Sequence, residues 1–221
     1  MAKENKLKTP PKGSVKFSIS LSAEQKVAKT QILKHPFNFI IGKAGSGKTL
    51  LAVQVALDMF FKKQINKIII TRPTISTEDN GFLPGSEREK MEPWLVPIRS
   101  NMRKVYNKLE KLERMEKSEE IELVSLAHFR GRTFDNAVVI VDEFQNLSRS
   151  QLSMAIGRLG KDSKLIFCGD SYQIDLRDKN WSAYHDMSKL VNSKYVHKTV
   201  LEDSHRHSAI DDLLELLNGY H

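Results

Sequence analysis

The residues with the clearest chemical meaning lie at positions 38–49, which read NFIIGKAGSGKT. The apolar run Phe39 to Ile41 predicts a short buried strand, and Leu50 to Phe61 follows with helical spacing. The segment between them has the form GxxxxGKT, whose glycines let successive backbone N–H groups converge on an anion. A phosphate held there would lie at a helix N-terminus, where the helix dipole favours negative charge. We therefore expect a nucleotide phosphate site in this loop.

The contacts expected in this loop follow from the residue types. Lys48 can reach the β- and γ-phosphates, and Thr49 can provide a hydroxyl ligand for Mg²⁺. The other nucleotide contacts are expected from the loop residues Gly42, Lys43, Ala44, Gly45, Ser46 and Gly47. Gln25 has two interpretations, which the sequence leaves open. It stands three residues after Ser22, as in a helix capping box, and its amide could instead recognise adenine.

A pair of acidic residues follows a second apolar run. Residues 137–141 read AVVIV, a continuous β-branched run typical of a strand covered on both faces. Asp142 comes directly after it and is expected to complete the Mg²⁺ site opposite Thr49. Glu143 is then placed to polarise a water molecule for attack on the γ-phosphate. The plain alternative is a helix N-terminus that carries two acids.

The elements that must position these residues alternate between strands and helices. Apolar runs predict strands over 39–41, 67–71, 121–124, 137–141, 164–168 and 195–201, and helical spacing predicts helices over 21–34, 50–61, 94–115, 148–159 and 210–217. Such alternation implies right-handed crossovers, so we expect an α/β fold with three αβα layers and a mainly parallel sheet. A long loop over 74–92 and a helical segment inserted at about 93–118 are also expected. Ligands of such folds bind beyond the carboxyl ends of the strands, where the polar residues named above are found.

Composition narrows the class of protein. The chain has 221 residues, one cysteine and a net charge of +8. A disulfide framework is therefore excluded, and the positive charge suggests a polyanionic partner. Because no apolar run approaches the length of a membrane span, we expect a soluble cytoplasmic protein without membrane contact. Residues 1–14 are expected to form a disordered basic tail, and residues 15–221 a single domain.

Six short motifs occur in one order along the chain. They are GKAGSGKT at 42–49, TRP at 71–73, GFLPG at 81–85, RGRT at 130–133, DEFQN at 142–146 and GDSYQID at 169–175. From about residue 21 to 220 the chain resembles the PhoH family of P-loop ATPases, which is related to the N-terminal RecA-like domain of superfamily 1 helicases. The chain departs from the family pattern in three places. Phe144 stands where Ala is usual, Arg177 where Pro is usual, and the segment 72–81 lacks one family glycine.

The resemblance implies roles for further residues. Gln145 and Gln173 could each bond a γ-phosphate or the attacking water, or could be turn or cap residues, and by the resemblance Gln173 would sense the γ-phosphate. Single-stranded RNA or DNA would contact Thr71, Arg72, Arg130 and Arg132. Arg206 resembles the family's C-terminal Arg-His motif. Only 46 residues follow Asp175, too few for a second RecA-like domain, so the arginine of the ATP site should come from this domain or from another subunit. We therefore expect a homo-oligomer, for which a hexameric ring is one arrangement.

The expected function is Mg²⁺-dependent ATP hydrolysis, coupled to binding or unwinding of RNA or DNA by an oligomer. One alternative is an ATP-dependent switch or scaffold without helicase activity. A small-molecule kinase is the third interpretation. A kinase needs an acceptor pocket and a lid, whereas Glu143 and Gln173 favour water as the nucleophile.

Overall fold

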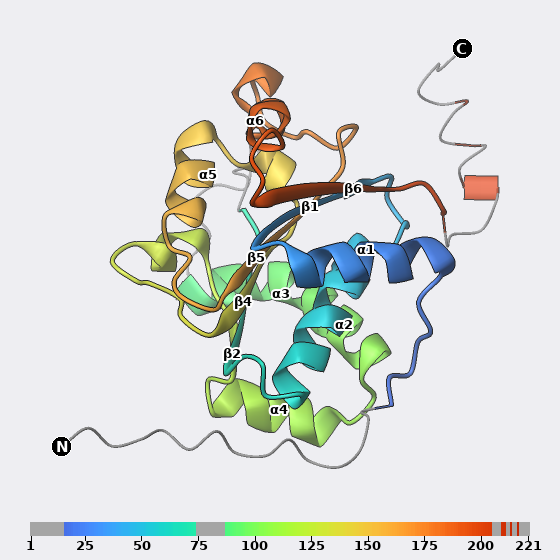
Figure 1. Cartoon of the computed structure of the whole chain (residues 1–221), viewed down its shortest axis with the longest axis vertical. Coiled ribbons are helices and arrows are strands. Elements are labelled where there is room, and N and C mark those ends of the chain that lie inside the picture. The colour runs from blue at the N-terminus through green and yellow to red at the C-terminus, as the bar shows by residue number, and fades with distance from the viewer. Residues whose placement is uncertain (1–15, 74–86, 205–208, 211–212, 214–215, 217–221) are drawn as a thin grey trace.

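The computed structural model describes residues 16–73, 87–204, 209, 210, 213 and 216 (Figure 1). Among them a six-stranded sheet runs through the centre, and every pair of neighbouring strands is parallel. The strand order is β3-β2-β4-β5-β1-β6. The strands are β1 (Phe37–Gly42), β2 (Lys67–Thr71), β3 (Ile121–Leu123), β4 (Ala137–Val141), β5 (Lys164–Gly169) and β6 (Val196–Leu201).

Helices cover both faces of the sheet, which confirms the expected αβα layers. The helices are α1 (Ala23–Lys34), α2 (Lys48–Phe61), α3 (Glu87–Val105), α4 (Leu109–Lys117), α5 (Arg149–Ile156) and α6 (Tyr184–Leu190). The first four pack on one face, and α5 and α6 pack on the other (Figure 1). Within the described residues, none of these helices is long and apolar enough to span a membrane.

Strand β4 shows why the sequence forms this sheet. Val138 and Ile140 join the core under α1 to α4, and Val139 and Val141 join the core under α5 and α6. All four side chains are buried, so both faces of the strand select β-branched residues. The central strands therefore leave only their ends open to a ligand.

The predicted helix over 94–115 is wrong as a single element. The chain turns at residues 106–108 and forms α3 and α4 instead. Tyr106 is buried at this turn, with its ring centroid 5.0 Å from that of Phe61 on α2. Helix α3 packs against α2 and α4 against β3, and one straight helix could not contact both. Leu109, the first residue of α4, is exposed.

Other boundaries also differ from the predictions. Helix α3 begins at Glu87, inside the predicted loop 74–92, because the residues before Pro93 are strong helix formers. The sequence does not predict helix α6, since Met187 is its one buried residue and its periodicity is weak. The tail 1–14 and most of the helix 210–217 lie outside the described residues. The assignment of residues 15–221 to one domain therefore stays a prediction.

Candidate functional site

The loop between β1 and α2 has the backbone that an anion site requires. Gly45 and Gly47 have φ angles of 89° and 81°, in the left-handed region that glycine adopts most readily. Gly47 is the N-cap of α2 and provides no side-chain cap, so the first N–H groups of the helix face the loop. The Ser46 hydroxyl is buried and has no hydrogen-bond partner among the described residues. These donors match the oxygens of a phosphate.

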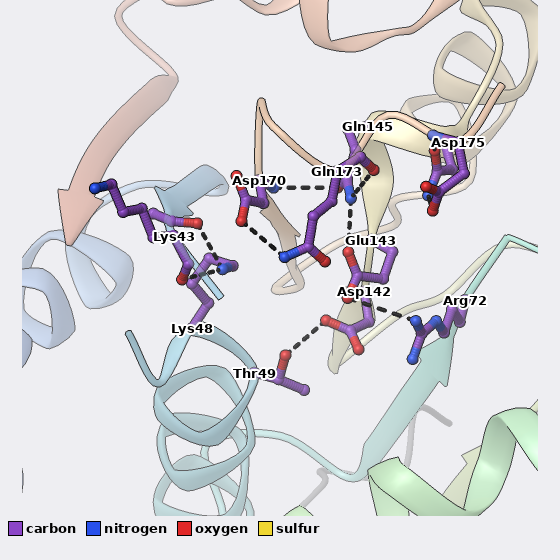
Figure 2. Close-up of polar contacts among 12 residues, drawn as sticks. Lys43, Lys48, Thr49, Arg72, Asp142, Glu143, Gln145, Asp170, Gln173 and Asp175 are labelled. Atoms are coloured by element: carbon purple, nitrogen blue, oxygen red, sulfur yellow. Dashed lines mark hydrogen bonds and ion pairs between the residues drawn. The ribbon is translucent and has the colours of Figure 1, made fainter. Parts of the chain in front are cut away.

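Lys48 brings a cation to the same loop. Its Nζ donates hydrogen bonds to the carbonyl oxygens of Gly42, at 2.7 Å, and Lys43, at 2.9 Å (Figure 2). The ammonium group is thus held against the loop by neutral acceptors. A phosphate oxygen would bind it more strongly, because both partners would then be charged.

Thr49 and Asp142 meet across the edge of the sheet. The Thr49 hydroxyl donates a 2.6 Å hydrogen bond to Asp142 Oδ1 (Figure 2). Burial raises the pKa of Asp142 to about 6, the neighbouring Glu143 carboxylate adds to this effect, and the Thr49 hydrogen bond opposes it. A cation bound beside Asp142 would favour the ionised carboxylate. One hydroxyl and one carboxylate oxygen, completed by phosphate oxygens and water, form a donor set that suits Mg²⁺.

The Glu143 carboxylate is held by two donors from neighbouring elements. Gln145 Nε2 donates to Glu143 Oε2 at 2.6 Å, and Arg72 Nη2 lies 3.5 Å from Glu143 Oε1 (Figure 2). The Glu143 backbone is left-handed, with φ 53° and ψ 42°, a conformation that costs a residue with a side chain some free energy. This conformation and the two donors fix where the carboxylate points.

Gln145 connects Glu143 to the loop after β5. The side chain is fully buried, and its second amide contact is a 2.9 Å hydrogen bond to the carbonyl oxygen of Gln173. Its Oε1 accepts from the backbone N–H of Asp170 at 3.2 Å. The sequence also allows Gln145 to bind a γ-phosphate or the attacking water. In the described conformation, however, protein groups satisfy the amide, so Gln145 acts here by holding Glu143.

A cavity of about 680 Å³ lies between the phosphate loop, Thr49 and Glu143. It is lined by Ile19, Ser20, Leu21, Ser22, Gln25, Ala44, Gly45, Gly47, Lys48, Thr49, Leu50, Asn101, Lys104, Glu143 and Gln173. Lys48, Thr49, Glu143 and Gln173 thus face one space, as the sequence predicts from the strand ends. Asn101 is missed by sequence reasoning, because nothing in the sequence shows that α3 crosses this edge of the sheet. Lys104 belongs to the predicted helix over 94–115, but the sequence does not place it at this cavity.

Gln25 performs the capping role. Its N–H donates to Ser22 Oγ, and its Oε1 accepts from the Ser22 N–H, both at 3.2 Å. Gln25 Nε2 also donates to the carbonyl oxygen of Ser46 at 3.2 Å, which ties α1 to the phosphate loop. The capping box is therefore confirmed, and a contact with adenine stays a prediction.

Several residues assigned to nucleic acid do not lie at the cavity. Arg130 and Arg132 are absent from its lining, and Arg132 Nη2 pairs with Glu122 Oε2 at 2.8 Å. Arg132 also lies beside a separate cavity of about 910 Å³ along β3. The Thr71 side chain is buried, so it offers a nucleic acid no surface. Arg206 lies outside the described residues.

Comparison with known proteins gives the family. Residues 19–218 match the family described as PhoH-like protein. The chain belongs to the PhoH-like protein family. A PhoH-like protein of Mycobacterium leprae is 35% identical over 186 residues, covering 82% of this chain and 53% of that protein. A PhoH-like protein of Synechocystis is 42% identical over 146 residues, covering 66% of this chain and 44% of that protein. The chain thus spans about half the length of these curated PhoH-like relatives.

Solved structures share the PhoH-like fold at low sequence identity. The large terminase of a thermophilic bacteriophage has a TM-score of 0.53 at 13% identity, covering 89% of this chain and 50% of that one. The Pif1 helicase of Candida albicans has a TM-score of 0.52 at 18% identity, covering 91% of this chain and 44% of that one. These likenesses confirm the expected α/β fold, and the RecA-like relation stays a prediction.

Phe144, a departure from the PhoH pattern, has a structural explanation. Its ring is fully buried and lies 5.2 Å from that of Phe39 and 5.9 Å from that of Tyr184, measured between centroids. The ring packs directly over Gly169, where a Cβ atom would clash with it. Phe144 therefore belongs to the core beneath the site.

Proposed function

We propose that this chain binds ATP with Mg²⁺, hydrolyses it, and couples hydrolysis to the binding of single-stranded RNA or DNA as an oligomer. One observation carries the proposal. The Lys48 ammonium group, the Thr49–Asp142 pair and the Glu143 carboxylate meet at one edge of a parallel sheet, beside a cavity of about 680 Å³. Membership of the PhoH-like family supports the same reaction.

Binding uses the phosphate loop and the metal ligands. The loop N–H groups, Lys48 and the Ser46 hydroxyl donate to phosphate oxygens. Thr49 and Asp142 hold Mg²⁺, which when bound neutralises charge that develops on the phosphates. Gln25 lies at the cavity wall, where its side chain can contact the base.

Hydrolysis uses Glu143 as the general base. Its carboxylate accepts a proton from a water molecule at the γ-phosphate. Gln145 and Arg72 hold the carboxylate in place, and they lie on elements that the sheet fixes relative to the phosphate loop. Gln173 shares the cavity with Glu143 and is placed to sense the γ-phosphate.

The nucleic-acid partner is supported by charge and by the position of Arg72. The chain carries a net charge of +8, which favours a polyanion. Arg72 follows β2 at the edge that holds the ATP site, and it contacts Glu143. A phosphate bound near Arg72 would therefore act close to the general base.

ATP turnover tests this function directly. The rate is measured without nucleic acid, with single-stranded RNA and with single-stranded DNA, and Lys48→Ala serves as the control without a functional phosphate loop. We expect turnover in the wild type, stimulation by at least one nucleic acid, and loss of turnover in the control. ATP binding without turnover under all three conditions would contradict hydrolysis and favour a switch or scaffold.

A further inference from the structure

Two aromatic rings stand out from the loop that follows β5. Trp181 is 72% exposed, the highest value among the large hydrophobic residues described, and Tyr172 is 63% exposed. We propose that segment 171–181 is a base-stacking surface for single-stranded nucleic acid. The inference rests on the proposed function for its partner class, and it assigns that partner a surface that includes none of the residues assigned to nucleic acid from the sequence.

The loop holds its rings on an ordered backbone. The N–H of Tyr172 donates to Asp170 Oδ1 at 2.9 Å. Trp181 ends a short 3₁₀ turn whose N-cap is Asp178, and the Trp181 N–H donates to the Asp178 carbonyl oxygen at 3.1 Å. The next residue, Ser182, is buried. Rings displayed on a fixed backbone can stack on a ligand with little loss of conformational entropy.

The surroundings of the rings favour a nucleic acid over an apolar partner. Arg177 and Lys179 are exposed between the two rings in sequence, together with two exposed aspartates, so the rings and the two cations, not a net positive charge, distinguish this segment. Ile174 and Leu176 are only partly exposed, so the exposed large apolar side chains of this segment are the two rings themselves. Exposed rings with neighbouring cations are the combination by which proteins bind single strands without reading their sequence.

The same loop is connected to the proposed general base. The Ser182 hydroxyl, one residue after Trp181, donates to the carbonyl oxygen of Gln145 at 2.5 Å. The Gln145 side chain in turn donates to Glu143 Oε2 at 2.6 Å. A nucleic acid whose base stacks on Trp181 would therefore contact the segment that is hydrogen-bonded to Gln145, the residue that holds Glu143. We expect binding at this surface to raise ATP turnover.

The chain contains a matched control at the other end of the sheet. Tyr195 is 55% exposed and has Lys194 Nζ 5.1 Å from its ring centroid. Its carbonyl oxygen accepts from the N–H of Phe37, the first residue of β1. Tyr195 therefore combines a ring and a cation as the proposed surface does, but lies at the amino ends of the strands.

The test measures oligonucleotide affinity for the wild type, Trp181→Ala, Trp181→Phe and Tyr195→Ala. The probes are labelled oligouridylate, oligodeoxythymidylate and an abasic deoxyribose-phosphate oligomer, each about twelve nucleotides long to fit the usual site sizes. Trp181→Ala should bind the two base-bearing probes roughly 5- to 150-fold more weakly, the range of one lost stacking contact. Trp181→Phe should stay within about 3-fold of the wild type because it keeps a ring, and Tyr195→Ala should match the wild type.

Salt dependence separates stacking from charge. Trp181→Ala should lower affinity without changing the slope of log affinity against log salt. Arg177→Ala with Lys179→Ala should reduce that slope by about 0.7 for each lost phosphate contact. The wild type should also prefer base-bearing probes to the abasic oligomer, and Trp181→Ala should lose this preference.

Three results would contradict the proposed base-stacking surface. The first is a Trp181→Ala affinity equal to that of the wild type. The others are equal binding of abasic and base-bearing probes by the wild type, and no oligonucleotide binding by the wild type. A changed oligomeric state in Trp181→Ala with unchanged affinity would identify a contact between copies instead. ATP turnover without nucleic acid is measured on the same samples. Its absence in the wild type would contradict the proposed hydrolysis, while the affinities decide the surface separately.

Discussion

Asp142 and Glu143 are neighbours in sequence whose surroundings suit them to different tasks. Asp142 is buried and accepts a hydrogen bond from Thr49, which suits a metal ligand. Glu143 turns away in a left-handed backbone conformation and is held by Gln145 and Arg72. Two adjacent carboxylates in different environments can thus be assigned to cation binding and proton transfer.

A single residue, Glu122, gives a prediction about how the stability of the fold depends on pH. Its carboxylate pairs with Lys67 at 2.5 Å and with Arg132 at 2.8 Å. Burial acts to raise the pKa of Glu122, but the hydrogen bonds from these two cations outweigh it and lower the pKa. A lowered pKa means that the group stabilises the fold above its ordinary pKa, and that this contribution is lost as the pH falls through the lowered value.

Glu122→Gln should therefore reduce the free energy of unfolding at pH 7 by about 1 kcal/mol, a value for a partly exposed ion pair. The difference from the wild type should shrink as the pH falls to about 3. Urea unfolding at both pH values measures it, and Glu113→Gln, an exposed carboxylate on α4, is the control. An equal difference at both pH values would show that charge is not the cause.

At the scale of elements, the packing of Phe144 beneath the site gives a second prediction. Phe144→Ala should reduce the free energy of unfolding by about 3–5 kcal/mol, because a fully buried ring is replaced by a cavity. Phe144→Leu should cost less, since it keeps most of the volume. Chemical denaturation measures both variants. Wild-type stability in Phe144→Ala would show that the ring is not part of the core.

The sequence predicts the strand before Asp142 and the phosphate loop, because local residue patterns determine both. The β-branched run before Asp142 could only be a strand covered on both faces, and the GxxxxGKT motif carries its own turn and helix start. The break between α3 and α4 could not be predicted, because it depends on what each helix packs against. The position of Asn101 at the cavity and the contacts of Gln145 could not be predicted for the same reason, because they form only once β4, β5 and α3 are brought together.

At the scale of the molecule, strand order explains why the polar residues gather. Strands β2, β4, β5 and β1 are neighbours and run parallel, so the residues after Thr71, Val141 and Gly169 and the loop after Gly42 share one edge. Residues far apart in sequence thus reach one cavity. No arginine lines this cavity among the described residues.

The arginine of the proposed ATP site is expected from this domain or from a neighbouring subunit, and Arg206 is the candidate for the second case. If Arg206 acts in trans, Arg206→Ala should bind ATP but turn it over about 10³–10⁵-fold more slowly, the usual effect of an arginine finger. Mixing Arg206→Ala with Glu143→Gln subunits should restore activity, because an Arg206→Ala subunit keeps its own Glu143 and receives Arg206 from its neighbour. Turnover is measured in mixtures shown to co-assemble. A mixed oligomer without activity would exclude action in trans.

Turnover and ATP affinity of Glu143→Gln decide whether Glu143 is the general base. The substitution keeps the shape of the side chain and leaves the phosphate loop, Thr49 and Asp142 intact. We predict ATP affinity close to that of the wild type and turnover reduced by about 10²–10⁴-fold, the usual contribution of a general base. Glu110→Gln, an exposed residue on α4, should leave both quantities unchanged. Wild-type turnover in Glu143→Gln would contradict the assignment of Glu143 and with it the proposed mechanism.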